Sequence, residues 1–358
     1  MRVAIEARSL ARPGSGITTY VRELAAALRE AAPATQFELL DHGPAHEALL
    51  PLWLNTAVPR WLHTVKPDVV HFTKAALPRR KEYPTVVTIY DVIPIVFPAS
   101  QKLAPRLLWP GTLRRAAEAA DHILTISEAS KRDIVEYLQV PPEKVTATPL
   151  AVASGIRNPE LGIKNADGGV PYILFLGTIE PRKNVPALVR AFARIAQGIP
   201  HRLVIAGRPY KGMEEVQDAI RRSAWAGRIE LRNFVPSDQL PALYAGADLF
   251  VWPSIYEGWG FPPQEAMAAG VPVIVSNGGS LPEVVGEGSE VVPFTTDIIA
   301  ARTHDEAFET ALAARMQEVL ADPATQARMR EAGFTQAHKN SWLEVARATL
   351  AVYEKVVL

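Results

Sequence analysis

Short apolar runs alternate with amphipathic segments through the first part of the chain. Six of these runs are largely apolar and rich in β-branched residues, which is typical of parallel strands buried on both faces. They comprise residues 2–6, 36–40, 68–72, 85–89, 121–126 and 144–148. A stripe of Ile17, Tyr20, Val21, Leu24 and Leu28 predicts an amphipathic helix after the first run. Further helices are expected at about 102–120 and 128–139, the second beginning after Ser127.

The alternation stops at residues 153–169, which are rich in Ser, Gly, Asn, Pro and Asp and indicate an interdomain linker. It then restarts with runs at 172–176, 202–206, 228–231, 248–252, 271–275 and 290–292. Helices are expected at 305–320, at 323–332 and after a capping box formed by Ser341 and Glu344. The pattern predicts an α/β protein of two Rossmann-like domains that face a cleft, divided at residues 155 and 156.

Composition narrows the class of protein. A chain of 358 residues suits two domains, and its 38 Lys and Arg balance its 38 Asp and Glu, so no net charge attracts nucleic acid. The absence of cysteine excludes disulfides, a thiol nucleophile and a thiolate-bound metal. No apolar run approaches the roughly 20 residues needed to cross a bilayer, and the N-terminus does not resemble a secretory signal. We expect a cytoplasmic protein, soluble or peripheral at the inner face of the membrane.

Two carboxylates lie in the segment 254–277, between two predicted strands. Prolines at 262 and 263 suit the first turn of a short helix and Gly270 suits its C-terminal cap, which predicts Glu265 in that first turn. Glu257 is expected in the preceding loop, at the ligand-binding edge of a parallel sheet. Ionised carboxylates accept protons from sugar hydroxyls, although a pair of them also occurs in glycosidases.

Two cations, Arg182 and Lys183, precede a predicted helix at 185–195. Positive charge at a helix N-terminus opposes the helix dipole, and a bound diphosphate would resolve this conflict; the alternative is a solvated pair at a loop tip. The segment Arg12-Pro-Gly-Ser-Gly-Ile17 follows the first strand, and its Gly14 and Gly16 would let backbone amides approach phosphate or sugar. A plain tight turn explains these glycines equally well.

Motifs for other chemistries are missing. The sequence has no metal-binding histidine pair, no Asp-x-Asp to hold a magnesium-bridged diphosphate, no P-loop and no Gly-x-Ser-x-Gly. We therefore expect no metal and no cofactor, and the cations must neutralise the diphosphate themselves. Because a diphosphate leaving group needs no strong acid, this reading is favoured over a glycosidase.

The segment from Glu257 to Glu265, with the following Ala-Met-Ala-Ala-Gly-Val-Pro, resembles the Glu-x7-Glu signature of the family-4 retaining glycosyltransferases of GT-B fold. Residues 176–184 resemble that family's phosphate-binding segment, and residues 88–94 and 120–133 also resemble family segments. The likeness covers essentially the whole chain. Tyr-Asp-Val-Ile-Pro at 90–94 and Gly-Thr-Ile-Glu-Pro-Arg-Lys-Asn at 177–184 resemble the mannosyltransferase branch.

The resemblance implies a nucleotide-sugar donor bound by the second domain (156–337) and an acceptor bound by the first (1–155), which the last helix, about 338–358, rejoins. Glu265 would bind the donor ribose, Glu257 the transferred sugar, and Arg182 with Lys183 the diphosphate, near Gly14 and Gly16. Further donor-binding residues carried over are Gly207, Arg208, Lys211, Phe234, Val235, Gly258, Trp259, Gly260 and Phe261.

The acceptor side departs from the family at one position. Tyr90 stands where many members have a histidine, and it cannot become a cation near neutral pH, whereas Asp91 matches and is expected to orient the acceptor or the sugar. The implied activity is retaining transfer of a hexose, mannose from GDP-mannose, to a saccharide or lipid-linked saccharide in cell-surface polysaccharide assembly. The alternatives are a nucleotide-sugar epimerase or hydrolase of the same shape and a non-catalytic sugar or nucleotide-sugar binding protein.

A basic, tryptophan-bearing rim is the feature that would suit a membrane surface. Arg79-Arg-Lys81 and the segment 107–115, which includes Trp109, would form it. Ordinary solvated and core residues are the alternative. Peripheral membrane contact is therefore an expectation from the residues alone.

Overall fold

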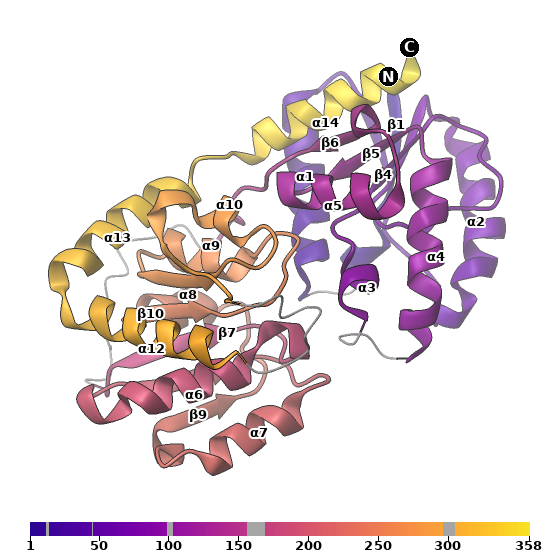
Figure 1. Cartoon of the computed structure of the whole chain (residues 1–358). Helices are drawn as coiled ribbons and strands as arrows, with labels where there is room; N and C mark the ends of the chain where they lie inside the picture. The colour runs from indigo at the N-terminus through magenta and orange to yellow at the C-terminus, as the bar shows by residue number, and fades with distance from the viewer. Residues whose placement is uncertain (12–13, 45, 99–102, 156–168, 296–304) are drawn as a thin grey trace. The chain divides into compact units, whose positions relative to one another are not determined.

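The computed structural model describes the chain apart from residues 12–13, 45, 99–102, 156–168 and 296–304 (Figure 1). It divides into two compact units. The first comprises Met1–Ile95, Leu103–Ala151 and Asn340–Leu358, and the second comprises Val96–Lys102 and Val152–Lys339. The sequence placed the divisions after residues 155 and 337. Most of the expected linker, and Arg12, lie outside the described residues.

The first unit contains a parallel sheet of six strands in the order β2-β1-β3-β4-β5-β6. Each strand coincides with a predicted apolar run to within one residue at either end. The strands are β1 (Arg2–Glu6), β2 (Gln36–Leu40), β3 (Val69–Phe72), β4 (Thr85–Thr88), β5 (His122–Thr125) and β6 (Val145–Ala147). β3, β4 and β5 are buried throughout, as strands covered on both faces must be.

In the described residues, six α-helices accompany this sheet. They are α1 (Gly16–Ala31), α2 (Leu50–Val65), the single-turn α3 (Ile93–Val96), α4 (Leu103–Ala119), α5 (Glu128–Leu138) and α14 (Trp342–Val357). Two predicted N-caps are confirmed: Ser127 accepts a hydrogen bond from the Ser130 amide, and Ser341 forms the capping box with Glu344. The sequence did not predict α2, which carries Pro59 in its interior, where proline usually disrupts a helix.

The second unit also contains a parallel sheet of six strands, in the order β12-β11-β10-β7-β8-β9. Its strands are β7 (Tyr172–Leu176), β8 (Arg202–Ala206), β9 (Ile229–Arg232), β10 (Leu249–Trp252), β11 (Val273–Ser276) and β12 (Glu290–Val292). The chain passes from β7 to β8 and β9 on one side, then returns to β10 on the other. The order therefore reverses between β7 and β10, and the crevice at such a switch point is where doubly wound sheets bind ligands.

Two groups of helices accompany the second sheet: α6 (Val185–Ile195), α7 (Met213–Arg222) and α12 (Glu306–Ala321) in one, and α8 (Leu240–Ala245), α9 (Phe261–Ala268), α10 (Leu281–Val285) and α13 (Pro323–Ala337) in the other. Within each group the helices contact one another. Among the residues described, no helix combines the length and apolar character that crossing a bilayer requires.

A series of buried side-chain hydrogen bonds joins α14 to the first sheet. His71 on β3 shares hydrogen bonds with the Tyr353 hydroxyl through Nδ1 and with Thr88 Oγ1 through Nε2, each 2.7 Å long. The Tyr20 hydroxyl lies 3.3 Å from the same Thr88 oxygen. Burial lowers the pKa of His71 to about 3, so this imidazole is neutral at physiological pH.

The His71 imidazole should make stability depend on pH. The unfolded chain takes up a proton near pH 6.5 while the folded chain stays neutral down to about pH 3, so stability falls as the pH falls through this window. In His71→Gln, the slope of unfolding free energy against pH, measured by urea denaturation, should be shallower by up to about 1.4 kcal/mol per pH unit. The exposed His42→Gln is the control; equal slopes in all three proteins would contradict the assignment.

Candidate functional site at the switch point of the second sheet

The two sequence motifs meet where β7 and β10 end. Arg182 and Lys183 lie in a 3-10 turn (Pro181–Lys183) after β7, and Glu257 lies in the loop after β10. Because β7 and β10 are parallel neighbours, their carboxyl ends lie at one edge of the sheet. The backbones are joined there: the Arg182 carbonyl accepts hydrogen bonds from the Ile255 amide (2.7 Å) and the Ser254 hydroxyl (3.0 Å).

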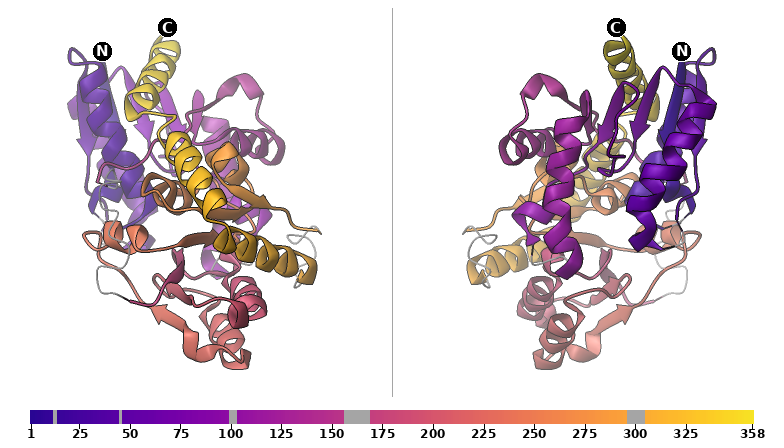
Figure 2. Two further views of the ribbon diagram at one scale, coloured as in Figure 1. Left: turned by 90° about the vertical axis from the view of Figure 1, so that its left-hand side faces the viewer. Right: turned by 90° about the vertical axis from the view of Figure 1, so that its right-hand side faces the viewer.

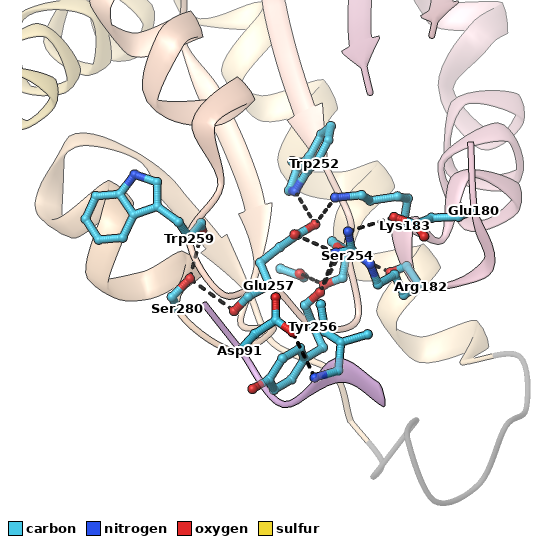
Figure 3. A network of polar contacts seen from close by, with 12 residues as sticks. Asp91, Glu180, Arg182, Lys183, Trp252, Ser254, Tyr256, Glu257, Trp259 and Ser280 are labelled. Carbon is cyan, nitrogen blue, oxygen red and sulfur yellow. Dashed lines mark hydrogen bonds and ion pairs between the residues drawn. The ribbon is translucent and has the colours of Figure 1, made fainter. Parts of the chain in front are cut away.

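Glu257 is the centre of this site (Figure 3). Its Oε2 accepts a hydrogen bond from Arg182 Nη1 at 2.5 Å, and its Oε1 accepts one from Lys183 Nζ at 2.5 Å. The indole N–H of Trp252 donates to the same Oε1 at 3.1 Å. The Glu257 residue is only 6% exposed, so three donors hold a carboxylate that water barely reaches.

The neighbouring charges and the burial of this cluster shift the pKa values of Glu257 and Lys183. Burial by itself raises the pKa of Glu257, but the charges of Arg182 and Lys183 outweigh that effect and bring the pKa to about 2. Burial, with the neighbouring Arg182 charge, lowers the pKa of Lys183, an effect that Glu257 partly offsets. Glu257 is therefore an ionised acceptor near neutral pH rather than a proton donor.

Glu180 adds a second carboxylate, with its Oε1 2.7 Å from Arg182 Nη2. Two cations thus face two carboxylates, and the four side chains carry no net charge. Sequence reasoning assigned the neutralisation of Arg182 and Lys183 to a bound anion; the chain itself supplies the counter-ions in this structure. A phosphate entering this site has to compete with Glu180 and Glu257 for the same donors.

Trp252 contacts the cluster through both its indole N–H and its ring. Its ring stacks with the rings of Phe175 and Phe250, at centroid distances of 4.8 and 5.9 Å, and Lys183 Nζ lies 4.5 Å from its centroid. A Cβ on Gly177 would lie 2.5 Å from the Trp252 ring, so that position has no room for a side chain. Sequence reasoning missed Trp252 and Glu180. A polar N–H at the carboxyl end of a buried strand was the available signal for Trp252.

The loop after β11 holds the backbone of Glu257 in place. The Glu257 carbonyl accepts hydrogen bonds from the amide and hydroxyl of Ser280, at 3.0 and 3.1 Å. Gly279 has a φ of +61°, and a Cβ there would lie 2.3 Å from the same carbonyl oxygen. Close packing therefore requires the two glycines after β11, Gly278 and Gly279, which sequence reasoning did not anticipate.

Glu265 is placed differently from its prediction. It is the fifth residue of α9, beyond the first turn, because Gly260 keeps a φ of +125° in the loop and the helix begins at Phe261. The expected glycine cap is confirmed, since Gly270 follows α9 with a φ of +72°. The Tyr244 hydroxyl donates to Glu265 Oε2 at 2.8 Å, and burial raises the pKa of this carboxyl while the Tyr244 bond opposes the rise.

Between the two glutamates, Gly258, Trp259 and Gly260 are buried and Phe261 is half-buried. The Trp259 indole N–H donates to Gln264 Oε1 at 2.9 Å, and its carbonyl accepts from the Ser280 hydroxyl at 2.7 Å. These residues fix the path of the loop from within. The indole N–H of Trp259 is already satisfied by the chain.

The loop after β8 lies beside the loop that carries Arg182. An isolated bridge pairs Ile179 with Pro209, and a Cβ on Gly207 would lie 1.8 Å from the Gly177 carbonyl oxygen. Packing alone therefore accounts for this glycine, whose φ is +146°. The Arg208 guanidinium lies 4.3 Å from the ring centre of Phe234, and both side chains are exposed. Lys211 is also exposed and Val235 is half-buried.

The other predicted residues belong to the first unit. Gly14 has a φ of +91°, and Gly16 begins α1 after its N-cap Ser15. The Tyr90 hydroxyl donates to the Thr73 carbonyl at 2.8 Å, and burial raises its pKa well above 10. Asp91 Oδ1 accepts from the Ile93 amide at 3.0 Å, at the start of α3. In the described part of the chain no three acidic or histidine side chains gather as a metal site would need.

Glu257→Gln should destabilise the protein by about 3 kcal/mol, because the substitution leaves Lys183 as a buried cation without its carboxylate. Adding Lys183→Met should restore part of the loss, since Arg182 keeps Glu180 as its partner. Urea denaturation of the single and double variants measures both effects. Glu265→Gln is the control, as its amide oxygen can still accept from Tyr244; additive losses in the double variant would contradict the coupling.

Two known families match the chain. The family described as Glycosyl transferases group 1 matches residues 157–336, and the one described as Glycosyltransferase Family 4 matches residues 7–153. O-antigen chain mannosyltransferase B of Escherichia coli is 31% identical over 288 residues, which are 78% of this chain and 72% of that protein. The MMP alpha-(1->4)-mannosyltransferase of Mycolicibacterium hassiacum is 31% identical over 248 residues, 68% of this chain and 56% of that protein.

Solved structures share the architecture at low sequence identity. Sucrose-phosphate synthase from Thermosynechococcus elongatus is 19% identical with a TM-score of 0.78, covering 99% of this chain and 98% of that one. The lipopolysaccharide biosynthesis glycosyltransferase WaaG is 15% identical with a TM-score of 0.71, covering 98% and 99%. With the two parallel sheets and the family matches, these likenesses show that the chain belongs to the family-4 glycosyltransferases and has their GT-B fold of two Rossmann-like α/β domains.

Proposed function

We propose that the protein transfers a mannosyl residue from GDP-mannose to a saccharide or lipid-linked saccharide in cell-surface polysaccharide assembly, with retention of configuration. The observation that carries this proposal is the cluster of Arg182, Lys183 and Glu257 at the switch point between β7 and β10. Mannosyltransferases among the relatives, including one for O-antigen chains, support the choice of sugar and product class.

The diphosphate of the donor enters the cluster by exchanging partners. Arg182 holds Glu180 and Glu257 at once, whereas Lys183 holds Glu257. When Arg182 releases Glu180, its guanidinium fork becomes available to a phosphate, and Lys183 adds a second donor. Negative charge grows on the diphosphate as its bond to the sugar breaks. Cations already fixed by a buried carboxylate stabilise that charge without reorganisation.

The two glutamates serve different parts of the donor. Glu257, ionised at any working pH because its pKa is about 2, accepts from hydroxyls of the transferred sugar. Glu265, positioned by Tyr244, accepts from the ribose hydroxyls. The exposed Arg208 and Phe234 present a cationic and an aromatic face to the base.

The remaining steps follow from the retaining reaction. The acceptor hydroxyl attacks from the face that the diphosphate leaves, and the leaving phosphate takes the acceptor's proton, so the reaction needs neither a general acid nor a resident metal. Asp91 in the first unit orients the acceptor or the sugar, beside Tyr90. An acceptor carried on a lipid places the enzyme peripherally at the cytoplasmic face of a membrane.

Donor choice is the first test. Calorimetry should give GDP the tightest binding among GDP, UDP and ADP, and GDP-mannose should support transfer. Arg182→Gln and Lys183→Gln should each slow transfer on the order of 100-fold, the loss typical for a donor to developing negative charge.

Arg190→Gln is the matched control, because it breaks another ion pair of the second unit, with Glu309, away from the cluster. Unchanged turnover in both cluster variants would sink the phosphate assignment. Release of free mannose, or formation of an epimer, from GDP-mannose alone at the rate of transfer would instead indicate a hydrolase or epimerase.

The ribose assignment has its own test. Glu265→Gln should weaken GDP binding by about tenfold, the equivalent of one or two hydrogen bonds. The same substitution should leave binding of 2′,3′-dideoxy-GDP unchanged, because that ligand lacks the hydroxyls Glu265 accepts from. Calorimetry with both ligands gives the comparison, and equal losses for the two would show that Glu265 acts only on the fold.

A further inference from the structure

A cavity of about 50 Å³ lies in the first unit between α2 and α4, over β3 and β4. These two helices cover one face of the first sheet (Figure 2). A crossover between parallel strands usually carries a helix, but the twelve residues between Phe72 and Thr85 form none. An irregular segment takes the place of a crossover helix here, and the space between it, α2 and α4 remains partly open.

The cavity has an apolar floor and a basic rim. Leu62 from α2, Val70 and Phe72 from β3, and Leu77 are buried and form the floor. The rim has four cations from two distant segments, Arg79, Arg80 and Lys81 together with Arg115 of α4. A hydrogen bond of 2.8 Å from Arg115 Nη2 to the Pro78 carbonyl joins the two segments.

The described residues leave part of the positive charge of the rim without a partner carboxylate. Lys81 Nζ lies 2.6 Å from Asp121 Oδ1, so this cation has a partner. Glu82 is the one acidic residue among those lining the cavity, and its Oε2 lies 3.4 Å from His63 Nε2. Throughout the described ranges, no carboxylate forms an ion pair with Arg79 or Arg80. The Arg79 amide is held by Asn55 Oδ1 at 2.7 Å, which fixes the backbone that presents both guanidinium groups.

We propose that this cavity binds a phosphate group. The space of about 50 Å³ exceeds the roughly 10–15 Å³ of cavity volume that one water molecule needs, and a guanidinium group can bind two phosphate oxygens at once, as Arg79 and Arg80 would here. Arg115 of α4 also lines the cavity. The phosphate belongs either to the headgroup of an anionic lipid or to a soluble phosphorylated compound, and both sources offer the same oxygens.

A lipid source would also use the exposed apolar side chains of α4. Leu108 is 67% exposed and Trp109 is 48% exposed. Leu108 precedes Arg115 by two helical turns and so lies on the same side of α4. A membrane whose headgroup phosphate occupied the cavity would meet these side chains at its surface. A soluble phosphate would not touch them.

The test compares Arg79→Gln/Arg80→Gln with Arg29→Gln/Arg132→Gln, which removes the same charge from exposed positions on α1 and α5. Binding of inorganic phosphate is measured by calorimetry at low salt. Flotation is measured with vesicles of phosphatidylglycerol and of phosphatidylcholine. The rim variant should lose at least tenfold in phosphate affinity, whereas the control variant should match the wild type.

Leu108→Ser/Trp109→Ser separates the two sources. Loss of flotation on phosphatidylglycerol with phosphate binding intact supports the lipid headgroup. Rim-dependent phosphate binding without flotation supports the soluble compound. Phosphate binding that is absent, or that the rim and control variants weaken equally, overturns the proposal. Because neither measurement uses a donor or an acceptor, this outcome is independent of glycosyl transfer.

Discussion

The burial of one carboxylate between two cations is the constraint on which the candidate site of the second unit depends. Glu257 is held by Arg182, Lys183 and Trp252, each from the carboxyl ends of adjacent strands. None of the charged groups is stable alone at that depth, since an unpaired buried ion costs several kcal/mol. The order of the strands, the glycines beside the loop and the stacked Trp252 together hold these charged side chains within contact distance of one another.

This arrangement also changes how the cations act. An arginine or lysine side chain in water must reorient to bind a phosphate, and the free-energy cost of this reorientation reduces how much the cation stabilises the transition state. Here the carboxylates hold both groups in place before any ligand arrives, and Glu180 occupies the part of Arg182 that a ligand would use. The four side chains carry no net charge, so an anion that bound here would have to exchange partners with Glu180 or Glu257 rather than rely on simple attraction.

The strands could be predicted from the sequence, because a strand buried on both faces consists of an unbroken apolar run such as residues 172–176. The position of the candidate site could also be predicted, because the loops that follow two neighbouring parallel strands lie at the same edge of the sheet. The exact start of α9 and the side-chain contacts of Trp252 and Arg182 could not be predicted. The helix start that moves Glu265 out of the first turn is decided by the backbone of Gly260. Trp252 resembles any core residue until its N–H is seen to reach Glu257, and the pairing of Arg182 with Glu180 depends on side-chain directions that spacing does not fix.

The return of α14 to the first sheet has a consequence for biosynthesis. The hydrogen bond between His71 and Tyr353 joins residues 282 positions apart, whereas the second unit is drawn chiefly from the continuous stretch Val152–Lys339. During synthesis from the N-terminus, the first sheet emerges before the second unit but lacks α14 until the second unit has been made. The second unit can complete its core before α14 is made, so of these two units the one that begins first is completed second.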